Sequence, residues 1–249
     1  MAVYAGPPTS TNGLIYSIDP GNSRSYNING SATSFNNSVP GLSGNGNLRV
    51  GASIGRRYGG SISLDGLNDY VTLPLMANWC PQNINGYSSI SFEFWVNLED
   101  SNDAVFLSRY YNSGTGNKSI TLAKGGNIAV IAKTFYSTTI TTNWSFTNGI
   151  WYHIVMTISP TEVKVYKDAT QSFSANHGVT AAYDGAFDSM NNEGVGMGCG
   201  VLYNYAPYTE TNALQGYLGL INVYNKILTP TEIEINYKSM RARYNVWKP

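Results

Sequence analysis

The sequence predicts an all-β fold in which two antiparallel sheets pack as a sandwich, with one short helix near the C-terminus. Short apolar segments recur along almost the whole chain and are separated by Gly, Asn, Ser and Pro, which favour turns. Helix signals occur in one segment only. The 249 residues suit one large hydrophobic core, so we expect a single domain over 1–249, with residues 1–12 as an N-terminal arm.

The first third of the chain begins with a predicted strand and continues mostly as loop. The apolar run Leu14–Ile18 is followed by an Asp-Pro-Gly-Asn sequence that favours a turn. Residues 22–60 are dense in Asn, Ser and Gly, which predicts a long ordered loop with at most one short strand. Ser61–Leu64 and Tyr70–Leu73 then flank a Gly-containing segment, which predicts a strand, a tight turn and a second strand.

The clearest strand pattern lies at residues 89–98. Apolar residues alternate with others there, so Phe92, Phe94 and Val96 share one face of the strand and Glu93 stands on the other. We expect a central strand whose apolar face points into the core between the sheets, with Glu93 facing outward or into a groove.

Further apolar segments predict the remaining strands. They are Ala104–Ser108, Ser119–Ala123, Asn127–Ala132, Trp151–Ser159, Glu162–Lys167, Gly194–Leu202 and Leu214–Tyr224. Residues 170–192 read as loop.

The single helix is predicted over residues 230–244. Thr229 is a capping residue, Pro230 suits the first helical position, and Glu232 lies three residues after the cap. Apolar residues then recur at helical spacing from Ile233 to Tyr244, so one face of the helix should pack on the sandwich.

Charge limits the classes of partner. Fifteen basic residues balance fifteen acidic ones, and charged residues make up only 12% of the chain. A protein that binds nucleic acid or anionic membranes non-specifically carries a basic surface, so we expect no nucleic-acid partner. No apolar run is long enough to span a membrane, and the N-terminal residues do not resemble a signal peptide.

Two cysteines, Cys80 and Cys199, lie far apart in the sequence and outside any zinc-binding spacing. Two buried thiols are favoured over a disulfide.

Six segments in order resemble the laminin-G-like domains of the concanavalin A-like lectin and glucanase superfamily, in particular versions found in bacteriophage proteins. They are Gly13–Asn22, Ser43–Gly46, Ser63–Val71, Ser91–Val96, Trp151–Thr157 and Gly216–Ile233. The resemblance implies a jelly-roll sandwich of two antiparallel sheets with the C-terminal helix on the outside. Because this fold carries lectins, glycosidases and structural proteins, it does not decide the function.

Catalysis requires groups that the sequence does not bring together. Glycosidases of this superfamily use two carboxylates on one strand face, and Glu93 has no second carboxylate two or four residues away. His153 alternates with apolar neighbours, which indicates a packed strand residue. We therefore expect no enzymatic activity.

Calcium is the cofactor that the resemblance suggests, because many laminin-G-like domains bind it. Asp65, Asn68 and Asp69 supply suitable oxygen atoms. The same residues also form turns by bonding their own backbone, so both interpretations stay open.

Aromatic residues in predicted loops are the remaining candidate for function. Aromatic rings stack on sugars or fill protein interfaces, while neighbouring amides bond hydroxyl groups. Packing of the loops on themselves is the third interpretation. The candidate residues are Trp79, Tyr110, Tyr111, Tyr203, Asn204, Tyr205 and Tyr208.

Three hypotheses follow. The first is a non-enzymatic bacteriophage virion protein, displayed on the particle as a capsid decoration, head fibre or tail adhesin. Its partners would be other capsid or tail proteins, together with a host-surface glycan. The second is a carbohydrate-binding lectin module, and the third is a glucanase-like glycoside hydrolase.

Overall fold

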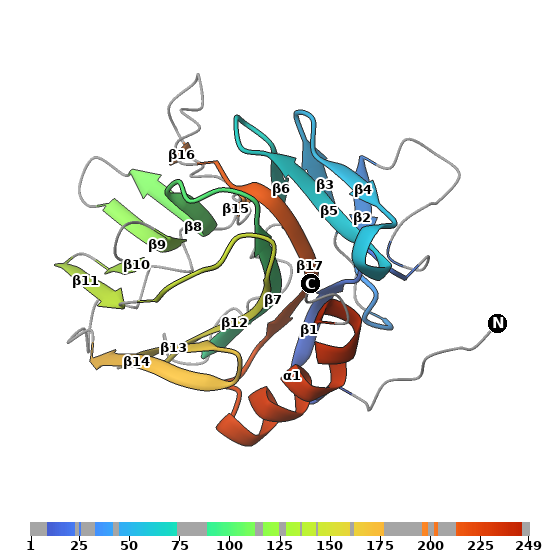
Figure 1. Cartoon of the computed structure of the whole chain (residues 1–249). Coiled ribbons are helices and arrows are strands. Elements are labelled where there is room, and N and C mark those ends of the chain that lie inside the picture. Colours follow the sequence, from blue (N-terminus) through green and yellow to red (C-terminus); the bar gives the residue numbers. More distant parts are fainter. Residues whose placement is uncertain are drawn as a thin grey trace.

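A computed structural model of the chain contains two sheets and a C-terminal helix (Figure 1). It describes residues 9–22, 25, 33–41, 45–73, 89–112, 117–124, 128–134, 136–142, 144–159, 162–176, 196–198, 202–203 and 213–245.

The first sheet, called sheet A, has the strand order β14-β13-β12-β7-β17-β5-β4, and β1 also pairs with β17. Its pairings among the described residues are antiparallel. Its strands are β1 (Leu14–Ile18), β4 (Ser53–Gly55), β5 (Ser61–Asp65), β7 (Ile90–Leu98), β12 (Trp151–Ile158), β13 (Glu162–Lys167), β14 (Thr170–Asn176) and β17 (Gln215–Tyr224).

The second sheet, sheet B, has the order β11-β10-β9-β8-β15-β6-β3-β2, and β16 pairs with β8 in parallel. Its strands are β2 (Ser34–Asn36), β3 (Asn45–Arg49), β6 (Tyr70–Thr72), β8 (Ala104–Asn112), β9 (Asn117–Lys124), β10 (Ile128–Thr134), β11 (Tyr136–Thr142), β15 (Gly196–Met197) and β16 (Leu202–Tyr203).

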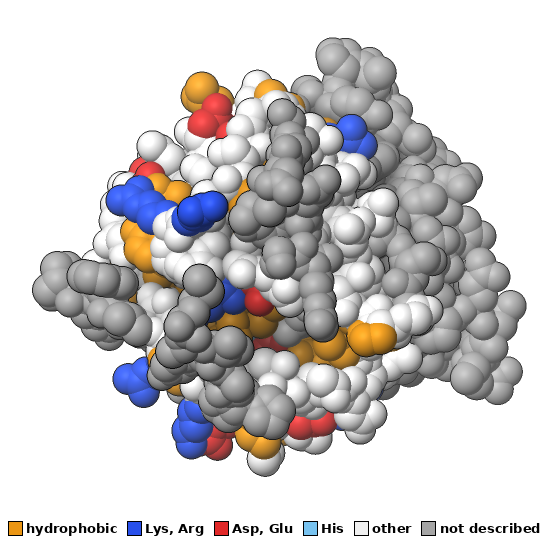
Figure 2. Space-filling model, turned by 90° about the vertical axis from the view of Figure 1, so that its right-hand side faces the viewer, with side chains coloured by type: hydrophobic (Ala, Val, Ile, Leu, Met, Phe, Trp, Pro, Cys, Tyr) orange, Lys and Arg blue, Asp and Glu red, His pale blue; other side chains and the backbone are white. Residues whose placement is uncertain are grey.

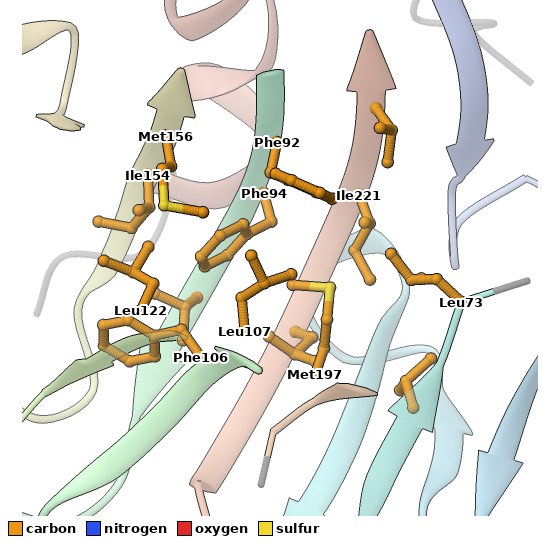
Figure 3. Close-up of a cluster of buried hydrophobic side chains, with 14 of the residues drawn as sticks. Leu73, Phe92, Phe94, Phe106, Leu107, Leu122, Ile154, Met156, Met197 and Ile221 are labelled. Carbon is orange, nitrogen blue, oxygen red and sulfur yellow. The ribbon is translucent and has the colours of Figure 1, made fainter. Parts of the chain in front are cut away.

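The main core lies between the sheets. Phe92, Phe94 and Val96 of the central strand β7 are buried there, which confirms the predicted face of this strand. Figure 3 shows Phe94 of sheet A facing Phe106 and Leu107 of sheet B. The ring centroids of Phe94 and Phe106 are 6.1 Å apart. Alternation along each strand leaves the residues in between on the outer faces.

The predicted helix is α1 (Pro230–Asn245), and its first turn has the expected capping box. The backbone N–H of Glu232 donates to Oγ1 of Thr229 over 3.2 Å, and the N–H of Thr229 donates to Oε2 of Glu232 over 2.9 Å. Ile233 and Tyr244 are buried, and Tyr237 and Met240 are partly buried against the outer face of sheet A. The helix thus covers one sheet, as the sequence predicts. No helix in the described ranges has the length and hydropathy needed to cross a membrane.

Residues 22–60 contain more structure than the sequence indicates. Three short strands, β2, β3 and β4, and a 3-10 turn η1 (Arg57–Gly59) lie in the segment expected to be mostly loop. Their Asn-, Ser- and Gly-rich sequences have low strand propensity, and pairing with β5 and β6 overrides it. The same correction applies to β14, which lies within the expected loop 170–192.

The turn after β5 joins the two sheets. The predicted strand, tight turn and strand are confirmed, and because β5 belongs to sheet A and β6 to sheet B, the turn passes from one sheet to the other. Asp69 fixes the crossing: its two carboxylate oxygens accept the N–H groups of Gly51 over 2.7 Å and of Asp65 over 3.0 Å.

Candidate functional site

The outer face of sheet A carries a row of large side chains across its three central strands. Asn97 of β7 lies directly opposite Trp151 of β12 on one side and Tyr217 of β17 on the other. The next row along the same face contains Trp95 and His153. The three strands come from distant parts of the sequence, so only their pairing brings these residues together.

Helix α1 covers part of this aromatic face. The ring of Tyr244 stacks 4.8 Å from Trp95 and lies 4.6 Å from Trp151, measured between centroids. Gly219 makes room for it, because a Cβ atom there would lie 2.6 Å from the Tyr244 ring. The Tyr244 hydroxyl accepts a hydrogen bond from the N–H of Leu220 over 2.7 Å. These contacts fix the helix on the sheet.

The turn η1 (Arg57–Gly59) packs on Trp151 and Tyr217, on the same outer face of sheet A. The Tyr58 ring meets Trp151 and Tyr217 edge-on, at centroid distances of 5.3 and 5.4 Å. Arg57 donates a hydrogen bond from Nη1 to the Tyr217 hydroxyl, and the same nitrogen lies 3.7 Å from Oε1 of Glu99. The Arg57 and Glu99 side chains are 62% and 40% exposed, so this polar rim is open to solvent. Burial raises the pKa of Tyr217, which keeps its hydroxyl neutral.

Figure 2 shows one side of the molecule. Charged side chains form a few separate groups among neutral polar atoms, and a hollow near the middle exposes hydrophobic side chains beside an acidic and a basic one.

Glu93 lies beneath helix α1 in a closed group of polar residues. Its Oε1 is 2.7 Å from Nε2 of His153, and its Oε2 accepts hydrogen bonds from Asn222, Tyr224 and Asn236 over 3.0, 2.8 and 3.1 Å. Glu93 is 2% exposed and His153 is fully buried. Glu93 does face away from the core, as predicted, but the helix shields it from solvent.

Burial by itself raises the pKa of Glu93, but hydrogen bonds from His153, Asn222 and Tyr224 outweigh it, so the pKa lies below its ordinary value. The carboxylate is thus held ionised. Asn236 belongs to the helix and Glu93 to the sheet, so the group anchors one to the other. The positions beside Glu93 on this face carry no second carboxylate: they hold Ser91, Trp95, His153, Val155 and Asn222.

A family model named Laminin_G_3, described as the concanavalin A-like lectin/glucanases superfamily, matches residues 64–234. The chain belongs to this superfamily. The match covers more than half of the sequence and includes the central strands of sheet A. A search by sequence among curated proteins finds no match.

Solved structures of similar shape agree with the superfamily fold. The binding domain of botulinum neurotoxin serotype D is 14% identical, with a TM-score of 0.62, over 91% of this chain and 51% of that chain. Its ligand-binding domain in complex with N-acetylneuraminic acid is 12% identical, with a TM-score of 0.57, over 91% and 50%. This chain thus spans about half the length of these neurotoxin chains.

A second kind of relative matches over nearly its full length. Domain 4 of an extracellular arabinanase from Geobacillus stearothermophilus, in complex with arabinotriose, is 14% identical, with a TM-score of 0.52, over 91% of this chain and 98% of that chain. At such low identities, these likenesses show the fold.

The residues predicted to bind calcium, Asp65, Asn68 and Asp69, lie at the turn after β5. Oδ1 of Asp65 accepts the N–H groups of Leu67 and Asn68 over 2.8 and 3.3 Å, and both oxygens of Asp69 accept backbone N–H groups. These contacts give the aspartates a turn-forming role and do not by themselves build a calcium site. Calcium at this turn stays a prediction, which a shift of Tm on adding Ca²⁺ after chelation would support.

The predicted aromatic loop residues are only partly within the described residues. Tyr111 of β8 pairs with Tyr203 of β16, and Tyr110 pairs with Leu202, so their backbones lie side by side. Four others lie outside the described residues, as do both cysteines: Trp79, Asn204, Tyr205, Tyr208, Cys80 and Cys199.

The rim formed by Arg57, Tyr58, Glu99 and Tyr217 was missed in the sequence. Arg57 and Tyr58 lie in the segment expected to be loop, Glu99 lies directly after β7, and Tyr217 lies on β17. The available signal was the sequence Arg-Arg-Tyr-Gly-Gly, in which an aromatic residue next to two glycines indicates an irregular turn.

Proposed function

We propose that this chain is a non-enzymatic carbohydrate-binding module of the lectin type. The observation that carries the proposal is the solvent-exposed pair Arg57 and Glu99 beside the buried Tyr217 hydroxyl and the aromatic cluster to which Tyr217 belongs.

Such a rim suits a sugar because a sugar ring is amphipathic. Its C–H groups pack on aromatic faces, and its hydroxyls both donate and accept hydrogen bonds. Arg57 offers donors in a fixed fork and Glu99 offers acceptors, and both are exposed enough to exchange water for ligand hydroxyls. The pair is also close to neutral, so it does not demand a charged ligand.

The comparisons support the proposal through two of the structures named above. One is a complex with N-acetylneuraminic acid and the other with arabinotriose. A glucanase activity has less support, because Glu93 is sealed beneath α1 and is surrounded by amide, phenol and imidazole groups instead of a second carboxylate.

Glycan binding is tested by array screening of the wild-type protein, followed by titration of each hit with Arg57→Ala and Arg57→Lys. Loss of the guanidinium fork should weaken binding at least about tenfold in Arg57→Ala, since charge-assisted hydrogen bonds contribute about 1.5–3 kcal/mol. Arg57→Lys should fall between Arg57→Ala and wild type. Lys238→Ala is the matched control, because Lys238 is a similarly exposed cation on α1 at 66%. Equal affinities for Arg57→Ala and Lys238→Ala would remove this rim from the proposal.

The predicted aromatic residues Tyr203, Tyr205 and Tyr208 form a second contact region within the same proposal. Replacing Tyr203, Tyr205 and Tyr208 together by Ala should weaken attachment to a glycan or to a particle while the circular dichroism spectrum stays unchanged. The Arg57 and triple-Tyr variants, measured side by side, separate the two surfaces.

Location is a further part of the proposal. The sequence resemblance to phage versions of the domain favours display on a virion, in contact with capsid or tail proteins. Co-purification of the chain with intact particles at a fixed copy number would support this. A chain that never sediments with particles would exclude it and leave glycan binding untouched.

A further inference from the structure

Asn97 has a buried side chain with no partner among the described residues. It is fully buried, yet both its Nδ2 and Oδ1 atoms lack a hydrogen-bond partner there. Buried amides in proteins are nearly always hydrogen-bonded, and an unpaired one destabilises the fold. Packing contacts do not replace the missing hydrogen bonds, so the unpaired Asn97 amide needs another explanation.

A second unpaired donor lies next to it. Nε1 of Trp151 is also buried and unpartnered in the described structure. Trp151 stands directly opposite Asn97 on the neighbouring strand. The unpaired groups therefore comprise the donors and acceptor of an amide and the donor of an indole, grouped on one side of sheet A.

Tyr58 closes this group from outside. Trp151 and Tyr217 flank Asn97 on the two adjacent strands, and the Tyr58 ring contacts both of them edge-on. The Trp151 and Tyr217 rings also contact each other, with centroids 6.5 Å apart, so Tyr58 completes a cluster of three rings on the strands that flank Asn97. Tyr58 remains partly exposed on its other side.

The backbone under Tyr58 is strained. Its φ of 56° and ψ of 32° lie in the left-handed region, which a bulky aromatic residue rarely adopts. Gly59 and Gly60 follow with φ of 73° and 110°. The turn is held at its ends, where Ser61 and the N–H of Gly60 both donate to the carbonyl of Arg57. Strained conformations of this kind persist only where neighbouring contacts enforce them, and they cluster at ligand-binding and switch regions.

We propose that Tyr58 is a side-chain lid over a sugar subsite, and that a neutral sugar ring displaces it. The sugar ring would take the place of the Tyr58 side chain against Trp151 and Tyr217 and bond through neighbouring hydroxyls to the Asn97 amide and the Trp151 indole N–H. This inference rests on the proposed glycan binding and names the groups that form hydrogen bonds with the sugar.

The chemistry of the enclosed groups selects a neutral ligand. An amide presents a donor beside an acceptor, which matches two adjacent hydroxyls of a sugar. None of the unpaired groups carries a charge, so a carboxylate or phosphate buried there would lose its hydration without compensation. Arg57, which donates to the Tyr217 hydroxyl, already has Glu99 as its counter-ion at 3.7 Å.

Two variants test the lid by the sign of their effect. Tyr58→Asn keeps a residue that tolerates the left-handed backbone but removes the competing ring, so affinity for a neutral sugar should rise at least threefold. Tyr58→Phe keeps the ring and should bind as the wild type does. If Tyr58 were instead a platform on which the sugar stacks, Tyr58→Asn would weaken binding, and that result overturns the lid.

Asn97→Leu tests whether the Asn97 amide bonds the sugar. An apolar residue of similar size removes the unpaired amide, so Tm should stay equal or rise while sugar affinity falls at least tenfold. A purely structural Asn97 predicts a fall in Tm with no change in affinity. If Asn97→Leu fails to fold, Trp151→Phe keeps an aromatic ring but removes the indole N–H together with part of the ring, and it should weaken binding.

The experiment is calorimetric titration of these variants with arabinotriose, cellotriose and maltotriose, with 3′-sialyllactose as the acidic probe. Wild type that binds neutral sugars, with Asn97→Leu and Tyr58→Asn both unchanged, overturns this subsite and leaves the proposed function standing, because Asn97 then bonds an ordered water only. Binding of the sialylated probe alone overturns the neutral assignment. Wild type that binds none of the four overturns the subsite and, together with an array that shows no hits, the proposed function.

Discussion

Nε2 of His153 lies 2.7 Å from Oε1 of Glu93, across two neighbouring strands, and both side chains are buried beneath helix α1. Glu93 is the one carboxylate on the central strand β7 and so its candidate for catalysis, yet its contacts tie the helix to the sheet. Asn236 of α1 donates to the same carboxylate, so this polar group holds the helix over one part of the outer face of sheet A, while Arg57 and Glu99 stay exposed beside another part.

Glu93→Gln should destabilise the fold without affecting glycan binding. The change removes the negative charge that accepts four hydrogen bonds in a buried site, so we expect a loss of about 2–4 kcal/mol in the free energy of unfolding. Denaturant titration measures it. Glu234→Gln, at a glutamate 53% exposed on the same helix, should change stability by less than about 0.5 kcal/mol. Equal effects of the two would remove the anchoring role.

Stability should decrease in acid. Burial tends to raise the pKa of Glu232, but Lys226 and the capping contacts of Thr229 outweigh it and bring the pKa to about 2. Because the folded pKa lies below the ordinary value of 4.5, this glutamate stabilises the fold above that pH, and its contribution is lost as pH falls toward 2. The lowered pKa of Glu93 acts in the same direction. Between pH 6 and pH 2 the free energy of unfolding should fall by about 1–2 kcal/mol more in the wild type than in Glu232→Gln, as thermal unfolding at each pH measures. Parallel curves would contradict the assignment.

Phe94→Ala should cost about 3–5 kcal/mol, because it opens a cavity between the sheets where Phe94 packs on Phe106. Leu67→Ala, at a side chain 76% exposed, is the control and should leave the denaturation midpoint nearly unchanged. An unaltered midpoint for Phe94→Ala would mean that the register of β7 is wrong.

Removal of residues 230–249 should cause aggregation. The deletion uncovers Trp95, Trp151 and Leu220, which are at most 7% exposed in the intact chain. It also leaves Glu93 and His153 without their cover. Size-exclusion chromatography with light scattering checks this, and a truncated chain that remains monomeric and equally stable would show that the helix does not seal the sheet.

Local patterns predicted the parts of the fold that local chemistry decides. Alternation alone selects the buried face of β7, and the capping box lies within four consecutive residues, so both were readable. The short strand β3 was not, because its neighbour β6 is more than twenty residues away and supplies the pairing.

The candidate site was the least predictable part. Trp151, Asn97 and Tyr217 become neighbours only through the register of three strands, and Tyr58 reaches them from a turn whose backbone is irregular. Single residues of this group could be placed on a face by alternation, but their meeting depends on tertiary pairing. The predicted loop aromatics remain an independent prediction.

One measurement tests the central claim of a module that binds glycans without cleaving them. Wild type and Glu93→Gln are incubated with each oligosaccharide that binds, and saturable binding is recorded alongside release of new reducing ends. We predict binding by both proteins and no release of reducing ends by either. Hydrolysis by the wild type that disappears in folded Glu93→Gln would contradict the account and identify the chain as a glycoside hydrolase.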